Sequence, residues 1–132
     1  MQPVLRCMFF AICLAATPCA AASDPSDEIT YLIDLVRHSN CTFIRNGSEY
    51  DGPKAADHVQ QKYDYYRKEI FTTEDFIDKA ATKSMLSGTP YQVRCPGEAA
   101  TPAAVWLRTQ LQLYRAHAAT GTSGTGSGTG AN

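Results

Sequence analysis

The sequence contains few features that identify a biochemical function directly. Its 132 residues include one tryptophan, and 12 basic residues balance 13 acidic ones, for a formal net charge of −1. Without an excess of positive charge, the chain does not resemble a nucleic-acid-binding protein or one that binds membranes through a polybasic surface. No apolar run reaches the length of a membrane-spanning helix, so no transmembrane segment is predicted for the mature chain.

Motifs for catalysis and for cofactor binding are also missing. The chain has neither the G-x-x-x-x-G-K-[ST] nor the G-x-G-x-x-G loop that binds phosphates, and it lacks the G-x-S-x-G turn of many hydrolases. His38, His58 and His117 are far apart and show none of the paired spacing typical of zinc ligands. We therefore predict no cofactor, no metal site and no assigned catalytic residue, and a non-enzymatic role is favoured.

The N-terminal segment, residues 1–22, is organised like a secretory signal peptide. Arg6 precedes an apolar stretch at residues 8–16, and Ala20, Ala21 and Ala22 supply the small residues that signal peptidase needs. We predict cleavage after Ala22 and a periplasmic or secreted mature protein. A buried N-terminal helix is the main alternative, and a lipid anchor fits less well because no small residue precedes Cys19.

The other end of the chain has too few apolar residues to fold. Residues 119–132 read ATGTSGTGSGTGAN, so we expect a disordered tail that is either a spacer or without a task. The predicted folded part is a single small domain at residues 24–118. A domain of that size buries only a modest fraction of its surface, and its stability depends on further restraints.

Two of the five cysteines remain once the predicted signal peptide is removed. Export would place Cys41 and Cys95 in an oxidising compartment, where a disulfide between them is the simplest outcome. It would close a loop of about 55 residues and contribute about 4 kcal/mol on the chain-entropy model. A reactive thiol pair and an intermolecular bridge are the alternatives, but the absence of a C-x-x-C motif argues against redox catalysis.

The spacing of apolar residues predicts an α+β fold, with four helices packed on a small sheet of about three strands. Helices are expected at 24–40, 53–70, 73–88 and 101–118, and strands at 91–95 and in a hairpin at 41–50. The Asn46-Gly47 turn of this hairpin would pair Phe43 with Tyr50 and place Glu49 on the opposite face. The predicted inner faces include Ile29, Leu32, Ile33, Val36, Ala55, Ala56, Val59, Tyr63, Tyr66, Ile70, Phe76, Ile77, Ala80, Ala81, Met85, Leu107, Leu111 and Tyr114.

One group of polar residues is a candidate binding site. Arg45, Ser48 and Glu49 flank the predicted hairpin turn, and the helix that follows carries His58, with Lys62 and Tyr65 near it on the helix surface. An arginine can bind a carboxylate or phosphate through two hydrogen bonds. A histidine beside a glutamate can act as a general base for a serine nucleophile. The structural alternative is a surface Arg–Glu ion pair with a histidine that fastens a loop.

Four short motifs together resemble a known family. They are Phe43-Ile44-Arg45-Asn46-Gly47-Ser48-Glu49-Tyr50, Ala55-Ala56-Asp57-His58, Phe76-Ile77-Asp78 and Gly88-Thr89-Pro90-Tyr91-Gln92-Val93. Their order and spacing over residues 43–93 are similar to those of the YfeK-like family of small exported bacterial proteins, which is catalogued as a domain of unknown function. The resemblance implies a proteobacterial, periplasmic protein. It brings no activity, cofactor or catalytic residue.

These observations lead to three functional hypotheses. The first is an uncharacterised exported protein that serves as a small non-enzymatic binding or interaction module, with an envelope protein or a small ligand as partner. The second is a small envelope hydrolase or transferase that uses His58 and Glu49, and the third is a structural or stress accessory. A pocket enclosing Arg45, Glu49 and His58 would favour an enzyme, whereas a flat apolar patch around Tyr65 or Trp106 would favour a protein partner.

Overall fold

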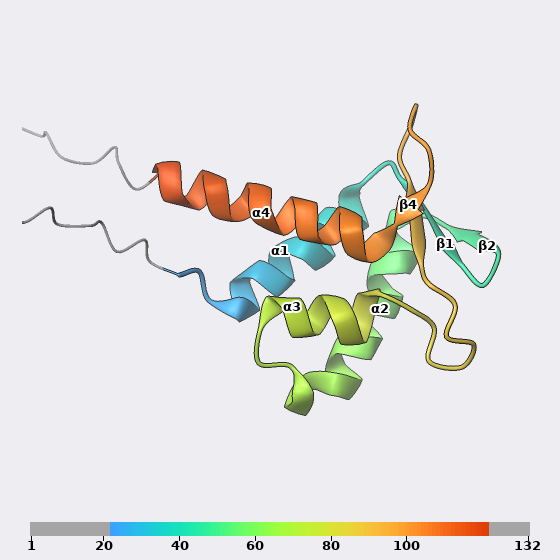
Figure 1. Cartoon of the computed structure of the whole chain (residues 1–132), viewed down its shortest axis with the longest axis horizontal. Helices are drawn as coiled ribbons and strands as arrows, with labels where there is room; N and C mark the ends of the chain where they lie inside the picture. The colour runs from blue at the N-terminus through green and yellow to red at the C-terminus, as the bar shows by residue number, and fades with distance from the viewer. Residues whose placement is uncertain (1–21, 122–132) are drawn as a thin grey trace, which may run out of the picture.

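The computed structural model describes residues 22–121, which form four helices and a four-stranded antiparallel sheet (Figure 1). The helices are α1 (Pro25–His38), α2 (Gly52–Tyr66), α3 (Thr73–Phe76) and α4 (Ala103–Gly121), with a 3-10 turn η1 (Arg67–Glu69) and a π-helical turn η2 (Ile77–Ala81). The strands are β1 (Thr42–Arg45), β2 (Ser48–Tyr50), β3 (Gln92–Arg94) and β4 (Thr101–Pro102). The predicted α+β class is confirmed, with one strand more than expected.

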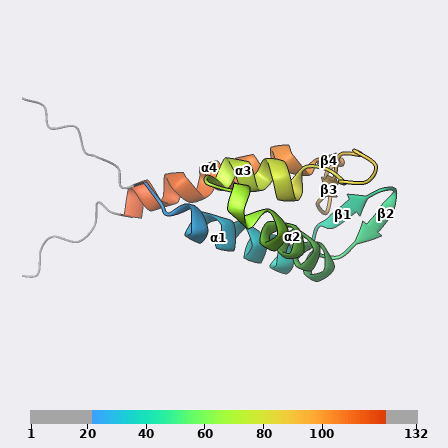
Figure 2. The same ribbon diagram turned by 90° about the horizontal axis from the view of Figure 1, so that it is seen from below.

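The helices form two layers, and the sheet lies at one end of them. Figure 2 shows α1 with α2 in one layer and α3 with α4 in the other. The start of α1 and the end of α4 lie at the same end of the molecule, opposite the sheet, in both views (Figures 1 and 2). Residues 1–21 of the predicted signal peptide and residues 122–132 of the predicted tail lie outside the described residues. Helix α4 continues to Gly121, beyond the predicted domain end at residue 118.

Helix α1 begins and buries its apolar face as the sequence predicts. The Asp24 carboxylate accepts a hydrogen bond from the backbone N–H of Ser26, and Pro25 occupies the first turn, where a missing N–H costs nothing. The helix ends at His38, two residues before the predicted end, because Ser39 is extended. Four apolar side chains of α1 are buried against the other helices: Ile29, Leu32, Ile33 and Val36.

The predicted hairpin and its register are confirmed. Asn46 and Gly47 both have positive φ angles, 50° and 76°, as the tight two-residue turn requires. Phe43 pairs with Tyr50, and Glu49 pairs with Ile44 on the other face. The full strand order is β2-β1-β3-β4, so both β2 and β4 are edge strands.

Pairing of β1 with β3 brings the two cysteines together. Thr42 lies opposite Arg94 in this antiparallel pair, so the residues just outside the paired segments, Cys41 and Cys95, face each other. Their Cα atoms are 4.1 Å apart and their sulphurs are bonded. The predicted disulfide is therefore present, and it joins the start of the hairpin to a strand that is distant in the sequence.

The predicted helix at 73–88 is much shorter in the structure. It starts as expected, with a capping box between Thr72 and Asp75, but regular helix and π-turn together end at Ala81. The following loop closes on itself through hydrogen bonds from Ser84 N to Thr89 O and from Gly88 N to Ser84 O. The hydroxyls of Ser84 and Ser87 also accept hydrogen bonds from backbone N–H groups of this segment, which disfavours helix. The placement of Met85 on the inner face was wrong, because this side chain is 57% exposed.

Two other helix boundaries differ from the predicted ones. Helix α2 ends at Tyr66 rather than near residue 70, and a 3-10 turn continues it to Glu69. Helix α4 starts at Ala103 and is not capped by Thr101, because Thr101 and Pro102 pair with β3 as an edge strand. The backbone N–H of Ala103 bonds to the Tyr91 carbonyl, so the helix start is fixed by the sheet.

Glu28 is a charged residue that is buried among the helices. Glu28 of α1 is 2% exposed, and Arg115 of α4 donates hydrogen bonds of 2.8 and 2.7 Å to the two oxygens of its carboxylate. The Thr73 hydroxyl donates to the same carboxylate at 2.5 Å, and Arg115 also binds Glu74 at 2.7 Å. The hydrogen bonds from Arg115 lower the pKa of Glu28, and burial opposes this effect. We call these four residues the Glu28 clamp; it joins α1, α3 and α4.

A glycine allows α1 and α2 to approach closely. A Cβ atom on Gly52 would lie 2.4 Å from the Val36 carbonyl oxygen and 2.8 Å from that of Arg37, and neither backbone atom can move aside easily. Glycine is therefore required here by contact, since the position has no positive φ angle.

We expect Gly52→Ala to lower the free energy of unfolding by about 3 kcal/mol, the upper part of the range for overpacking. The sign is informative, because an alanine that fitted in the helix would stabilise it by up to about 1 kcal/mol. Gly121→Ala is the matched control, since nothing lies within 4 Å of its added Cβ. Urea unfolding followed by circular dichroism measures both, and an equal effect of the two substitutions would contradict the contact argument.

Candidate functional site

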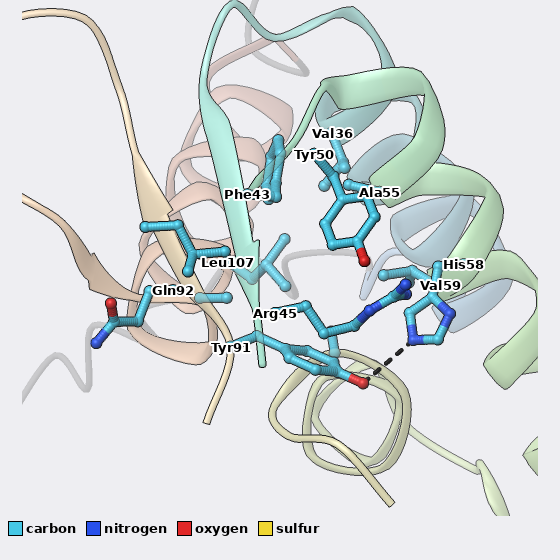
Figure 3. A pocket seen from close by; sticks show the side chains of 13 residues that line it. Val36, Phe43, Arg45, Tyr50, Ala55, His58, Val59, Tyr91, Gln92 and Leu107 are labelled. Carbon is cyan, nitrogen blue, oxygen red and sulfur yellow. Dashed lines mark hydrogen bonds between the residues drawn. The ribbon is translucent and has the colours of Figure 1, made fainter. Parts of the chain in front are cut away.

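A pocket lies at the sheet end of the molecule, between β1, the first turns of α2 and the start of α4 (Figure 3). Its wall is largely aliphatic and aromatic, and includes Val36, Phe43, Ala55, Val59 and Leu107. The cavity volume is about 40 Å³. One water molecule needs at least about 10–15 Å³ on this measure, so the cavity holds a few waters or one small chemical group.

Strand geometry brings Arg45 and Tyr50 to the same side of the pocket. Arg45 follows Phe43 by two residues in β1, so both side chains project from the same face of the sheet. Tyr50 pairs with Phe43 across the hairpin and shares that face. The Arg45 guanidinium carbon lies 4.4 Å from the centre of the Tyr50 ring, in a cation–π contact. A hydrogen bond from Arg45 lowers the pKa of the Tyr50 hydroxyl.

His58 of α2 and Tyr91, which precedes β3, complete the polar side of the pocket. The His58 Nε2 and the Tyr91 hydroxyl oxygen are 3.1 Å apart and form a hydrogen bond (Figure 3). Burial raises the pKa of the largely buried Tyr91 hydroxyl. Burial also lowers the pKa of His58, and the nearby charges of Arg45 and Lys62 lower it further. These effects favour the neutral form of His58, and the two charges that act on it are both positive.

Lys62 contacts the ring of Tyr91. Its ammonium group donates a hydrogen bond of 2.8 Å to the Lys83 carbonyl and lies 5.1 Å from the centre of the Tyr91 ring. The residue is buried, and burial together with the charge of Arg45 lowers the pKa of the Lys62 amine. Lys62 thus adds positive potential to this side of the pocket without lining it.

The structure brings together three of the six candidate residues predicted from sequence. Arg45 and His58 line one pocket, and Lys62 adjoins it through Tyr91. Glu49 projects from the other face of the hairpin and forms a 2.7 Å ion pair with Arg94, so it does not contact His58.

The other two candidates lie outside the pocket. Ser48 is exposed on the edge strand, and Tyr65 is 74% exposed and contacts the ring of Tyr66. The acid–base pair required by the hydrolase or transferase hypothesis is therefore not formed.

Sequence reasoning missed the two tyrosines of the site. Tyr50 could have been found, because the predicted register places it opposite Phe43 and next to Arg45 on one face. Tyr91 carried no such local signal, since its contact with His58 spans 33 residues and depends on how β3 joins the sheet.

Within residues 22–121, no group of three or more histidine, cysteine or acidic side chains is placed to hold a metal ion. Over the same residues, no helix has the length and apolarity needed to cross a membrane.

Comparison with known proteins identifies relatives but no activity. The model of a family described as "Family of unknown function (DUF5329)" matches residues 23–115. Over 57 residues the chain is 39% identical to "Uncharacterized protein YfeK" of Salmonella typhimurium strain LT2. That alignment covers 43% of this chain and 48% of the relative, so the chain spans about half the length of the curated protein it matches. No solved structure matches. The resemblance seen over residues 43–93 is thus confirmed, and the chain belongs to the DUF5329 family of unknown function.

Proposed function

We propose that this protein is a small exported binding module and that the pocket next to Arg45, Tyr50, His58 and Tyr91 holds its ligand. The observation that carries the proposal is that Arg45, Tyr50, His58 and Tyr91 lie on one side of a cavity whose other lining residues are apolar except for Gln92 (Figure 3). Small-molecule sites have this composition, with apolar walls for affinity and a few polar groups for orientation.

Binding without catalysis is the better supported use of this pocket. Its lining residues within the described chain include no serine, cysteine or carboxylate side chain. His58 is bonded to a tyrosine rather than to Glu49, so nothing at the site makes it a stronger base. Burial and two neighbouring cations instead favour its neutral form.

Two observations support export. The N-terminal segment, residues 1–22, has the charge, apolar stretch and small residues of a signal peptide. The Cys41–Cys95 disulfide is a bond that persists in oxidising compartments and is rare in the cytosol.

The experiment starts from the full chain expressed in a bacterium with a periplasm. The protein recovered from the periplasm is expected to have the intact mass of a chain that starts at Ser23 and carries one disulfide. We then expect small organic compounds, taken from anionic, neutral and cationic sets, to shift amide NMR signals around Arg45, His58 and Tyr91.

A pocket-filling variant provides the control. Ala55→Leu adds three carbons to a residue that lines the pocket, whereas Ala116→Leu adds them to an exposed position on α4. Ligand shifts should disappear in the first variant and persist in the second, with folding of each checked by circular dichroism. Retention of the chain in the cytoplasm would contradict export, and an absence of shifts around the pocket with every compound set would contradict the binding function.

A further inference from the structure

Building on the proposed function, we infer that the pocket takes a carboxylate carried on a small aliphatic body, with Arg45 and the Tyr91 hydroxyl as its two donors. Such a carboxylate occurs in free short-chain acids and at the C-terminus of a peptide that ends in alanine. The argument rests on charge, on donor count and on cavity size.

Arg45 is a cation without a carboxylate partner in residues 22–121. Four of the five other arginines in this part of the chain form ion pairs with acids: Arg37 with Asp57, Arg94 with Glu49, Arg108 with Asp78, and Arg115 with Glu28 and Glu74. The fifth, Arg67, lies over the Tyr63 ring outside the pocket. The Arg45 guanidinium instead lies against the Tyr50 ring at the pocket. The neighbouring Lys62 ammonium increases the positive potential that favours an anion there.

The His58–Tyr91 pair can offer a second donor. Neutral imidazole carries one N–H, on either Nδ1 or Nε2. When Nε2 carries it, His58 donates to the Tyr91 oxygen across the 3.1 Å contact, and the tyrosine O–H is left free to donate to a ligand. An anion selects this tautomer, because it accepts that O–H. Arg45 and Tyr91 extend their polar ends toward the same side of the pocket in Figure 3.

The number of charges favours a carboxylate over a phosphate. Arg45 is the one permanently charged side chain among the described residues that line the pocket, and burial together with two nearby cations favours the neutral form of His58. The Lys62 ammonium is engaged with the Lys83 carbonyl. One guanidinium matches one carboxylate through two parallel hydrogen bonds, whereas a phosphate dianion would keep a charge and several oxygens without partners.

The cavity sets the size of the aliphatic body. A volume of about 40 Å³ behind the polar groups, lined by Val36, Phe43 and Leu107, fits two or three carbons. Each methylene buried there should increase affinity about fourfold. We therefore expect propionate and butyrate to bind more tightly than acetate, and longer chains to gain no more.

The test measures dissociation constants by NMR titration of the mature protein at pH 7. The probes are propionate, its neutral analogue propionamide, inorganic phosphate, N-acetyl-Ala-Ala and the C-terminal amide of that dipeptide. The carboxylates should bind at least tenfold more tightly than their amides and than phosphate. A response to propionate alone indicates a free acid, and a tighter response to the dipeptide indicates a peptide terminus; both outcomes support the inference.

Two variants locate the donors. Arg45→Met should weaken propionate binding about a hundredfold, and Tyr91→Phe should weaken it about tenfold, as expected for hydrogen bonds to a charged group. Tyr65→Phe removes an exposed hydroxyl outside the pocket and should change nothing. If Arg45→Met fails to fold, Tyr91→Phe and the amide probes still decide the question.

The possible failures are distinguishable. Equal binding of propionate and propionamide, or tighter binding of phosphate, overturns the carboxylate inference and leaves the binding function intact. If neutral compounds shift the NMR signals around the pocket and no carboxylate does, the carboxylate inference is likewise overturned and the binding function is left intact. An absence of shifts with every compound overturns both the inference and the proposed function.

Discussion

Replacing Arg115 with alanine is expected to lower the free energy of unfolding by about 3 kcal/mol. The substitution removes the two hydrogen bonds that Arg115 donates to the buried Glu28 carboxylate and leaves it only uncharged donors, such as the Thr73 hydroxyl. Removing one partner of a buried ion pair typically costs about 3–5 kcal/mol, because the other charge is left in a poorly solvating environment. We expect a loss at the lower end of this range because the Arg115 side chain is 43% exposed, so water can take its place.

The matched control is Arg108→Ala on the same helix. Arg108 pairs with Asp78, and both side chains are largely exposed, so its loss should cost between about 0 and 1 kcal/mol. Urea unfolding at pH 7 measures both variants. Equal losses would show that the Glu28 clamp acts as an ordinary surface ion pair.

The same clamp predicts how stability depends on pH. The pKa of Glu28 is lowered from its usual value of 4.5 in the folded state, mainly by hydrogen bonds from Arg115. The pKa of Glu74 is lowered for the same reason. The stabilisation is therefore complete above pH 4.5 and is lost as the pH falls through the lowered folded-state values. Wild-type protein should lose stability steeply below pH 4.5, and Arg115→Ala should lose less over the same interval.

Removing the disulfide should have a comparable or larger effect. The double variant Cys41→Ala, Cys95→Ala is expected to lose about 4 kcal/mol of unfolding free energy, because the unfolded chain is no longer closed across about 55 residues. This bond also holds β1, which ends at Arg45, beside β3, which follows Tyr91. Urea unfolding with and without a reductant measures the effect.

Reductant supplies the control for that experiment. It should bring the wild-type protein down to the stability of the double variant, and it should leave the double variant unchanged. A wild-type midpoint that does not respond to reductant, together with a double variant of equal stability, would contradict a stabilising role for the bond.

Local chemistry made much of the fold predictable. The cap at Asp24 gave the start of α1, and the Asn46-Gly47 turn gave the hairpin register. The disulfide was predictable because two cysteines remain after the predicted signal peptide is removed, and export would place them in an oxidising compartment. The end of the third helix was not predictable from apolar spacing, because Met85 continues the pattern while the backbone at Ser84 pairs across a loop.

The candidate site was likewise predictable where its residues are close in the sequence. Arg45 and His58 are close in the sequence with a tight turn between them, and chain reach alone suggested their approach. The period of two residues in the strands already placed Glu49 on the opposite face, which the structure confirms.

Long-range partners lay beyond sequence reasoning. Tyr91 meets His58, and Arg115 meets Glu28 from 87 residues away, because of how whole elements pack. Glu28 lies one helical turn before Leu32 on the buried face of α1, so a buried charge was visible in the sequence, but not its partner.

The two ends of the described chain lie at the same end of the molecule, opposite the sheet (Figures 1 and 2). A label, an affinity tag or a solid support joined through either end would thus stand away from Arg45 and Tyr91. Immobilised protein should keep its binding capacity whichever end is used, which suits surface-based measurements. The same placement makes a circular permutant practicable, in which a linker joins residue 121 to residue 22 and new ends open in the exposed loop at Leu86.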